Sequence, residues 1–121
     1  MRNATQVAND YIALWNETDP ALRNEALVNA WKADATYADP VMRGKGRGEI
    51  EALIGAVHAK FPGFIFSLIA PVDGHGSAVR FSWGLGPKGG EAVIKGTDFV
   101  TLDGDRIAAV TGFLDLVPAS A

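Results

Sequence analysis

The sequence predicts an α+β domain in which three N-terminal helices cover one face of a curved antiparallel sheet and leave an internal pocket. Apolar residues recur at a helical period in the first half of the chain, and apolar and polar residues alternate in the second half. Short turns rich in Gly and Asp separate the alternating stretches. Helices followed by hairpins indicate an antiparallel sheet with its helices on one face, and not a parallel βαβ fold.

The three helices are expected from local start and stop signals. The first begins with a capping-box pattern of Asn3 and Gln6. Pro20 stands at the first position of the second helix, whose apolar stripe reaches Trp31. A Gly-rich basic segment, which we interpret as a flexible solvated connection, leads into the third stripe, and Pro62-Gly63 terminates it.

Five extended stretches are expected. The stretch Ala35 to Asp39 is short and precedes Pro40, which disfavours helical geometry in the residue before it. Three turn sequences divide the second half of the chain into four longer strands, expected at Phe64–Val72, Ser77–Leu85, Glu91–Leu102 and Arg106–Val117. A chain of 121 residues without a linker or repeat is expected to form a single domain, 1–121, with one core.

Composition argues against several classes of function. The net charge is −3 and is spread without runs, so nucleic acid is not expected as a partner. The absence of Cys and the two separated His residues argue against a protein metal site and a cysteine nucleophile. No apolar run approaches the ~18 residues of a membrane span and the N-terminus lacks a secretory apolar region, so we expect a cytoplasmic protein without a membrane partner.

Asp98 is the most informative polar residue because it shares a strand face with aliphatic residues. One alternate set of its stretch contains Ile94, Gly96, Asp98 and Val100. A carboxyl group among apolar side chains must find a partner, bind a ligand or take up a proton, and such groups are enriched at functional sites. The alternative is a bulge at Gly96 that turns Asp98 outward, or a structural Tyr or Arg partner.

Other candidates are individually ambiguous. Tyr11 and Trp15 lie four residues apart on the first helix and can line a cavity or form an ordinary aromatic core. Asp39 can act in a site or only bond nearby amides in its turn. His58 is expected either at the pocket rim or as a boundary histidine, and Arg80 points to the other side of its strand, outside the site.

The chain resembles the nuclear-transport-factor-2-like superfamily, which includes SnoaL-like polyketide cyclases and ketosteroid isomerases. The resemblance spans nearly the whole sequence. It rests on segments in a particular order: Tyr11–Asn16 followed by Asp19, Asp34–Pro40, Gly48 with Ile50, and Gly96–Phe99 before Asp103–Ile107. It implies a cone, in which a strongly curved antiparallel sheet wraps around the helices with its mouth open to ligand. It also implies a homodimer formed through the outer face of the sheet.

The resemblance also implies residue roles. Ketosteroid isomerases carry a tyrosine on the first helix, a general-base aspartate before a proline and a protonated aspartate on a later strand. The matching positions here are Tyr11, Asp39 and Asp98. The implied chemistry is cofactor-free proton transfer on a small apolar carbonyl compound, with Asp39 as base and Tyr11 and neutral Asp98 stabilising the enolate oxygen. The expected substrate-binding residues are Trp15, Tyr37, His58 and Phe113.

Two further hypotheses remain open at this point. The domain could bind a small molecule without catalysis, with Asp98 and Tyr11 only donating and accepting hydrogen bonds. It could also be an assembly module that uses its outer sheet face, and then side chains would fill the pocket. Catalysis requires the carboxyl groups of Asp39 and Asp98 to approach a common point, whereas binding does not.

Overall fold

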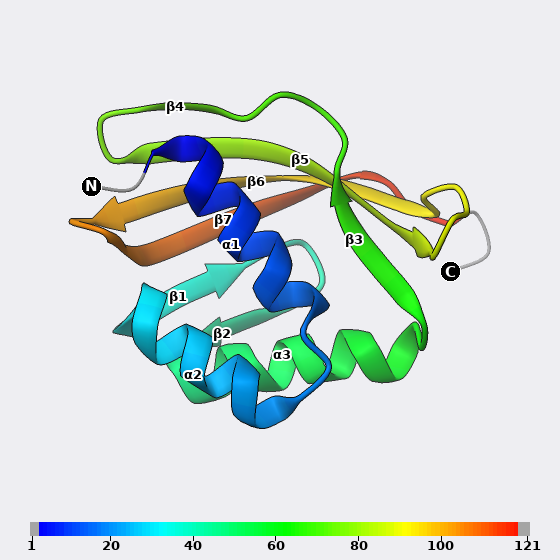
Figure 1. Cartoon of the computed structure of the whole chain (residues 1–121), viewed down its shortest axis with the longest axis horizontal. Coiled ribbons are helices and arrows are strands. Elements are labelled where there is room, and N and C mark those ends of the chain that lie inside the picture. The colour runs from blue at the N-terminus through cyan, green and yellow to red at the C-terminus, as the bar shows by residue number, and fades with distance from the viewer. Residues whose placement is uncertain (1–2, 119–121) are drawn as a thin grey trace.

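The computed structural model describes residues 3–118, which form three helices and one sheet. In Figure 1, α1 crosses one face of the sheet, and α2 and α3 lie beside β1 and β2. The α+β class predicted from the sequence is confirmed. None of the helices within this described part is long and apolar enough to cross a membrane.

Local signals set the helix starts. Helix α1 spans Ala4–Asn16 and begins at a complete capping box, in which the Asn3 side chain accepts from the Gln6 amide and the Gln6 side chain accepts from the Asn3 amide. Helix α2 spans Pro20–Ala30 with Asp19 as its N-cap. Helix α3 spans Arg47–Lys60 and starts after Gly46, whose φ of 86° is open to glycine.

Seven strands form one mixed sheet in the order β2-β1-β7-β6-β5-β3, with β4 paired to β5. All neighbours are antiparallel except β1 and β7, which run parallel. A parallel pair requires a long connection, which the intervening elements between β1 and β7 supply. The strands are β1 Trp31–Ala38, β2 Arg43–Lys45, β3 Phe64–Leu68, β4 Asp73–His75, β5 Ala78–Pro87, β6 Ile94–Asp103 and β7 Arg106–Leu116.

Several predicted boundaries are corrected. Trp31 begins β1 instead of closing the second helix, so the predicted brief strand starts four residues early and ends before Asp39. The Gly-rich segment is ordered, because Gly44 of β2 pairs with Tyr37 of β1 and lies against the Leu53 side chain. The wholly antiparallel sheet expected from the hairpins is wrong at the single β1–β7 pair.

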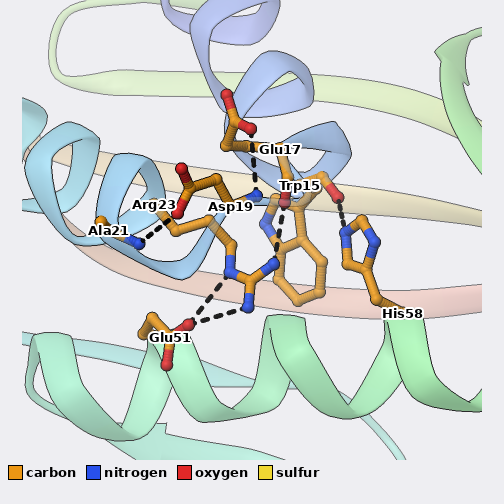
Figure 2. A network of polar contacts seen from close by, with 7 residues as sticks. All are labelled: Trp15, Glu17, Asp19, Ala21, Arg23, Glu51 and His58. Atoms are coloured by element: carbon orange, nitrogen blue, oxygen red, sulfur yellow. Dashed lines mark hydrogen bonds and ion pairs between the residues drawn. The ribbon is translucent and has the colours of Figure 1, made fainter.

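An ion pair between Arg23 of α2 and Glu51 of α3 joins these two helices, and Arg23 also contacts the loop between α1 and α2. The Arg23 side chain is 6% exposed; its Nε and Nη2 contact Oε1 of Glu51 at 3.0 and 2.9 Å. Its Nη1 donates to the Glu17 carbonyl at 2.9 Å. Figure 2 shows this network together with the Asp19 cap of α2 and the end of α1 at Trp15. These contacts fix the C-terminal end of α1, which carries aromatic side chains into the space between helices and sheet.

Candidate active site

The space between the sheet, α1 and α3 contains a cavity of about 650 Å³. Most of its surface is apolar, and two carboxyl groups and two tyrosines supply its main polar groups. Side chains do not fill it, contrary to what a pure assembly module predicts. The lining residues that carry the argument below are Tyr11, Trp15, Tyr37, Asp39, Phe66, Trp83 and Asp98, with Val41, Lys60 and Val117 at the mouth.

Asp98 lies on the inner face of β6 and is only 2% exposed. The pairing of β6 with β7 is irregular between Lys95 and Gly96, but Asp98 still faces the helices. Its Oδ2 accepts a hydrogen bond from the Tyr11 hydroxyl at 2.7 Å, whereas Oδ1 is buried without a hydrogen-bond partner in the described part of the chain. The structural-partner alternative therefore accounts for Oδ2, and the Trp83 indole lies close enough to Asp98 to stabilise its anion without a hydrogen bond to Oδ1.

Burial raises the pKa of Asp98 to about 6. The Tyr11 hydroxyl and the Trp83 indole act in the opposite direction because they stabilise the anion, and the nearby carboxylates of Asp39 and Asp115 raise the pKa further. A carboxyl group with this pKa changes its charge close to neutral pH. When Asp98 is protonated, Tyr11 continues to donate to Oδ2, and Oδ1 is then the atom that can carry the proton into the cavity.

Tyr11 projects from α1 into a cluster of aromatic rings and is 3% exposed. Its ring stacks on Trp31 with centroids 5.9 Å apart and meets Phe81 edge-on at 4.9 Å. Burial and the adjacent Asp98 carboxyl group raise the pKa of the Tyr11 hydroxyl well above its ordinary value. The hydroxyl therefore stays protonated and functions as a donor to Asp98.

Asp39 follows β1 directly and is held by three donors. Its Oδ1 accepts from the backbone amides of Val41 and Met42 at 2.8 and 2.9 Å, and its Oδ2 accepts from the Tyr37 hydroxyl at 2.7 Å. The turn predicted from the sequence is thus present, but its hydrogen bonds do not occupy every acceptor position of the Asp39 carboxylate. A carboxylate has about four lone-pair positions, so one remains for a proton from a ligand.

Asp39 and Asp98 lie on either side of Gly112 of β7. This strand lies between β1 and β6, so Gly112 pairs with Asp98 on one side and lies next to Asp39 on the other. A Cβ atom on Gly112 would stand 2.7 Å from Oδ1 of Asp98 and 3.2 Å from Cβ of Asp39. The absence of a side chain at this position allows both aspartates to approach the same point.

An aromatic wall, defined as Tyr37, Trp15, Phe66 and Trp83, runs from this point along the cavity. Successive ring centroids lie 5.4, 5.6 and 5.2 Å apart. Sequence reasoning did not assign Phe66 to the lining. The signal for Trp83 was present, because it belongs to the inward alternate set of β5 with Phe81 and Leu85.

Two predicted binding residues lie elsewhere. His58 does not line the cavity. Its Nε2 donates to the Trp15 backbone carbonyl at 2.7 Å and so joins α3 to the C-terminal end of α1 (Figure 2). Phe113 is on the outer sheet face, 52% exposed, with its ring edge-on to Phe99. It is displaced because β7 carries an extra residue between Ile107 and Ala109 relative to β6, which reverses the alternation of the positions that follow.

Arg80 lies outside the cavity, as the alternation indicates, and forms an ion pair with Asp73 at 2.9 Å. Within residues 3–118 no group of three or more His, Cys, Asp or Glu side chains is arranged to hold a metal ion. Tyr11, Tyr37, Asp39 and Asp98 are the main polar side chains that line the cavity.

Comparison with solved structures shows close relatives of the fold. A SnoaL-like family protein from Agrobacterium tumefaciens, for which an isomerase activity has been suggested, is 43% identical, covers 93% of this chain and 97% of its own, and superposes with a TM-score of 0.89. A protein from Catenulispora acidiphila with a ketosteroid isomerase-like fold, solved with trimethylamine, is 20% identical over 91% of this chain and 85% of its own, with a TM-score of 0.73. A protein from Sinorhizobium meliloti, suggested to be a polyketide cyclase, is 18% identical over 88% and 92% of the two chains, with a TM-score of 0.69.

A search of curated proteins found no match. The family model of the SnoaL-like domain matches residues 8–110, which include Tyr11, Asp39 and Asp98. This range covers most of the chain and agrees with the resemblance seen in the sequence. The chain belongs to the family of SnoaL-like domains.

Proposed function

We propose that this domain is a cofactor-independent enzyme that moves a proton within a small apolar carbonyl compound. The observation that carries the proposal is that Asp39 and Asp98, whose carboxyl groups are held differently, flank Gly112 and line the same apolar cavity. Oδ1 of Asp98 is buried and unpartnered, and Asp39 keeps one lone-pair position for a proton. The isomerase activity suggested for the 43% identical Agrobacterium protein points to the same reaction class.

The reaction begins at Asp39. Its carboxylate removes a proton from the carbon next to the carbonyl group, the C–H electron pair forms the enolate double bond, and the carbonyl π pair moves to the oxygen. Protonated Asp39 then returns the proton to another carbon, so that the double bond changes position and no atom is gained or lost. Three fixed donors keep Asp39 in one orientation during both steps.

Asp98 stabilises the enolate. In its protonated form it donates through Oδ1 to the enolate oxygen, while Tyr11 donates to Oδ2 and makes Asp98 a stronger donor. Tyr11 thus acts through Asp98 in this arrangement and is a positioning residue. Such a preorganised donor is worth about 10²–10³ in rate when it faces a developing oxyanion in a site that excludes water.

The isomerisation of 3-cyclohexen-1-one to its conjugated isomer, followed by ultraviolet absorbance, tests this proposal. Asp39→Asn should lower kcat/KM by at least ~100-fold because the base is lost, and Asp98→Asn by ~100-fold because the acidic donor is lost. Asp34→Asn is the matched control, an exposed carboxylate on β1 that should keep kcat/KM within about twofold.

The pH profile supplies an independent readout. Because only protonated Asp98 donates, kcat/KM should decrease as pH rises through about 6, the pKa of Asp98 in the free protein. Asp98→Asn should remove this decrease. If bound cyclohexenone neither isomerises nor exchanges its α-hydrogens with deuterated solvent, the domain binds ligands without catalysis and the proposed reaction is wrong.

A further inference from the structure

The inner end of the cavity, defined by Tyr11, Tyr37, Asp39 and Asp98, contains two carboxyl groups and no basic side chain of residues 3–118. Among the described residues that line the cavity, Lys60 is the basic side chain, and it is exposed at the mouth, where its Nζ lies over the Phe61 ring at 5.6 Å. The charged groups that act on Asp98 are the carboxylates of Asp39 and Asp115, both of its own sign. The neighbours from α1 and β1 are the neutral hydroxyls of Tyr11 and Tyr37.

The aromatic wall supplies a second, independent feature. Trp83 lies across Gly96, where an added Cβ would stand 2.4 Å from its ring, so the indole is fixed two residues from Asp98 on the same face of the sheet. Trp15, Phe66 and Tyr37 continue the wall with their rings tilted or edge-on to one another. Aromatic faces attract cations through the ring quadrupole, and the attraction strengthens where water is excluded.

We propose that the inner end of the cavity is a binding site for a small protonated amine that carries an apolar group. The ammonium group donates to the unpartnered Oδ1 of Asp98 and to the remaining acceptor position of Asp39. The aromatic wall contacts the carbon atoms next to the nitrogen, and the apolar group fills the rest of the cavity. The ammonium supplies the positive charge that two adjacent carboxyl groups otherwise lack.

This ligand class goes beyond the proposed carbonyl chemistry because it uses the opposite charge state of Asp98. A carbonyl oxygen requires protonated Asp98 as a donor, whereas an ammonium requires ionised Asp98 as an acceptor. The same cavity therefore prefers carbonyl compounds on the acid side of neutrality and amines above it. Amines would also compete with the proposed substrate for one site.

Cyclohexylamine and cyclohexanol test the proposal by isothermal titration calorimetry at pH 5 and pH 8. They share one ring, and the amine remains protonated throughout this range. Cyclohexylamine should bind about tenfold more tightly at pH 8 than at pH 5, because ionisation of Asp98 is nearly complete at the higher pH. Cyclohexanol should show little pH dependence.

Variants separate a charge effect from a loss of structure. Asp98→Asn should lower the cyclohexylamine affinity at least ~10-fold at pH 8 and leave cyclohexanol binding near its original value, which shows that the cavity is intact. Asp115→Asn is the matched control, because it removes an exposed carboxylate that lies outside the cavity. It should keep the cyclohexylamine affinity that Asp98→Asn loses. Trp83→Leu should weaken the amine more than the alcohol because it removes an aromatic face.

Equal affinities of the amine and the alcohol at pH 8, or an unchanged amine affinity in Asp98→Asn, would overturn this proposal. The proposed reaction has a separate outcome. Amine binding without isomerisation would remove the reaction and leave the ammonium site in place. Isomerisation without a preference for the amine would do the opposite.

Discussion

Asp98 links protonation to folding because the fold buries its carboxyl group, and no basic side chain in the described part of the chain acts on it. In the unfolded chain this group has an ordinary pKa, whereas burial raises it to about 6 in the folded protein. The folded state therefore holds the proton over a pH range in which the unfolded state has released it. Stability from this group is present in acid and is lost as pH rises from about 4 to about 6.

Asp98→Asn should remove this dependence. The amide has nearly the same shape and still accepts from Tyr11, but it carries no charge when pH rises. We expect the variant to be more stable than the natural protein at pH 7, by on the order of 3 kcal/mol, and to lose that advantage near pH 4. Urea denaturation of both proteins between pH 4 and pH 8 measures the difference, and parallel stability curves would contradict this explanation.

Strand β7 organises the candidate site although it contributes neither aspartate. Its position between β1 and β6 brings the end of one strand beside the middle of the other. Gly112 is the residue at which this happens, since an added Cβ there would stand 2.7 Å from Oδ1 of Asp98 and 3.2 Å from Cβ of Asp39.

Gly112→Ala should therefore damage both folding and function. A Cβ atom 2.7 Å from Oδ1 of Asp98 forces the carboxyl group or the strand to move, and overpacking of this kind costs about 1–3 kcal/mol. Gly48→Ala in α3 is the control, because nothing lies within 4 Å of its added Cβ and alanine favours a helix. Urea denaturation measures the loss of stability, and cyclohexanol binding measures the loss of ligand affinity. A Gly112→Ala variant with natural stability and affinity would show that Asp39 and Asp98 do not need this position to lack a side chain.

The outer face of the sheet carries apolar side chains that the core does not use. Phe99 and Phe113 are 43% and 52% exposed, and their rings meet edge-on with centroids 5.7 Å apart. They lie on β6 and β7, on the face opposite the helices. We propose that a second copy of this chain covers them, as the family resemblance implies.

Phe113→Ser should shift the chain toward the monomer in sedimentation equilibrium, because it removes an aromatic contact from the proposed interface. Val28→Ser tests whether any loss of exposed apolar surface has the same result, since Val28 is also 52% exposed but lies on α2. The natural chain and Val28→Ser should then sediment alike as dimers. A natural chain that is already monomeric would contradict the proposed interface.

Local chemistry explains which parts of the fold could be predicted from the sequence. The starts of α1 and α2 follow from Asn3 and Pro20, and the inward position of Asp98 follows from alternation along one strand. Trp31 was misassigned because an apolar residue after a helical stripe fits the next helical position and the first strand position equally well.

The parts that could not be predicted depend on pairing between distant segments. The parallel contact of β1 with β7 has no local signature, so the approach of Asp39 to Asp98 was implied only by the family resemblance. Phe113 is not at the cavity as expected, because the bulge after Ile107 reverses the alternation along β7 and cannot be read from the sequence. The Asp-Pro turn predicts only the two hydrogen bonds that Asp39 accepts from backbone amides. The third comes from the Tyr37 hydroxyl.

The central place of β7 also affects how the chain folds as it is synthesised. The three helices and strands β1 to β6 all precede β7, yet β1 and β6 are joined only through it. During translation, residues 31–38 thus present an open strand edge until residues 106–116 have left the ribosome, and an open edge invites pairing with other chains. The nascent protein can complete its sheet only after β7 is synthesised. The edge of β1 can therefore pair with other chains while most of the sheet is being synthesised.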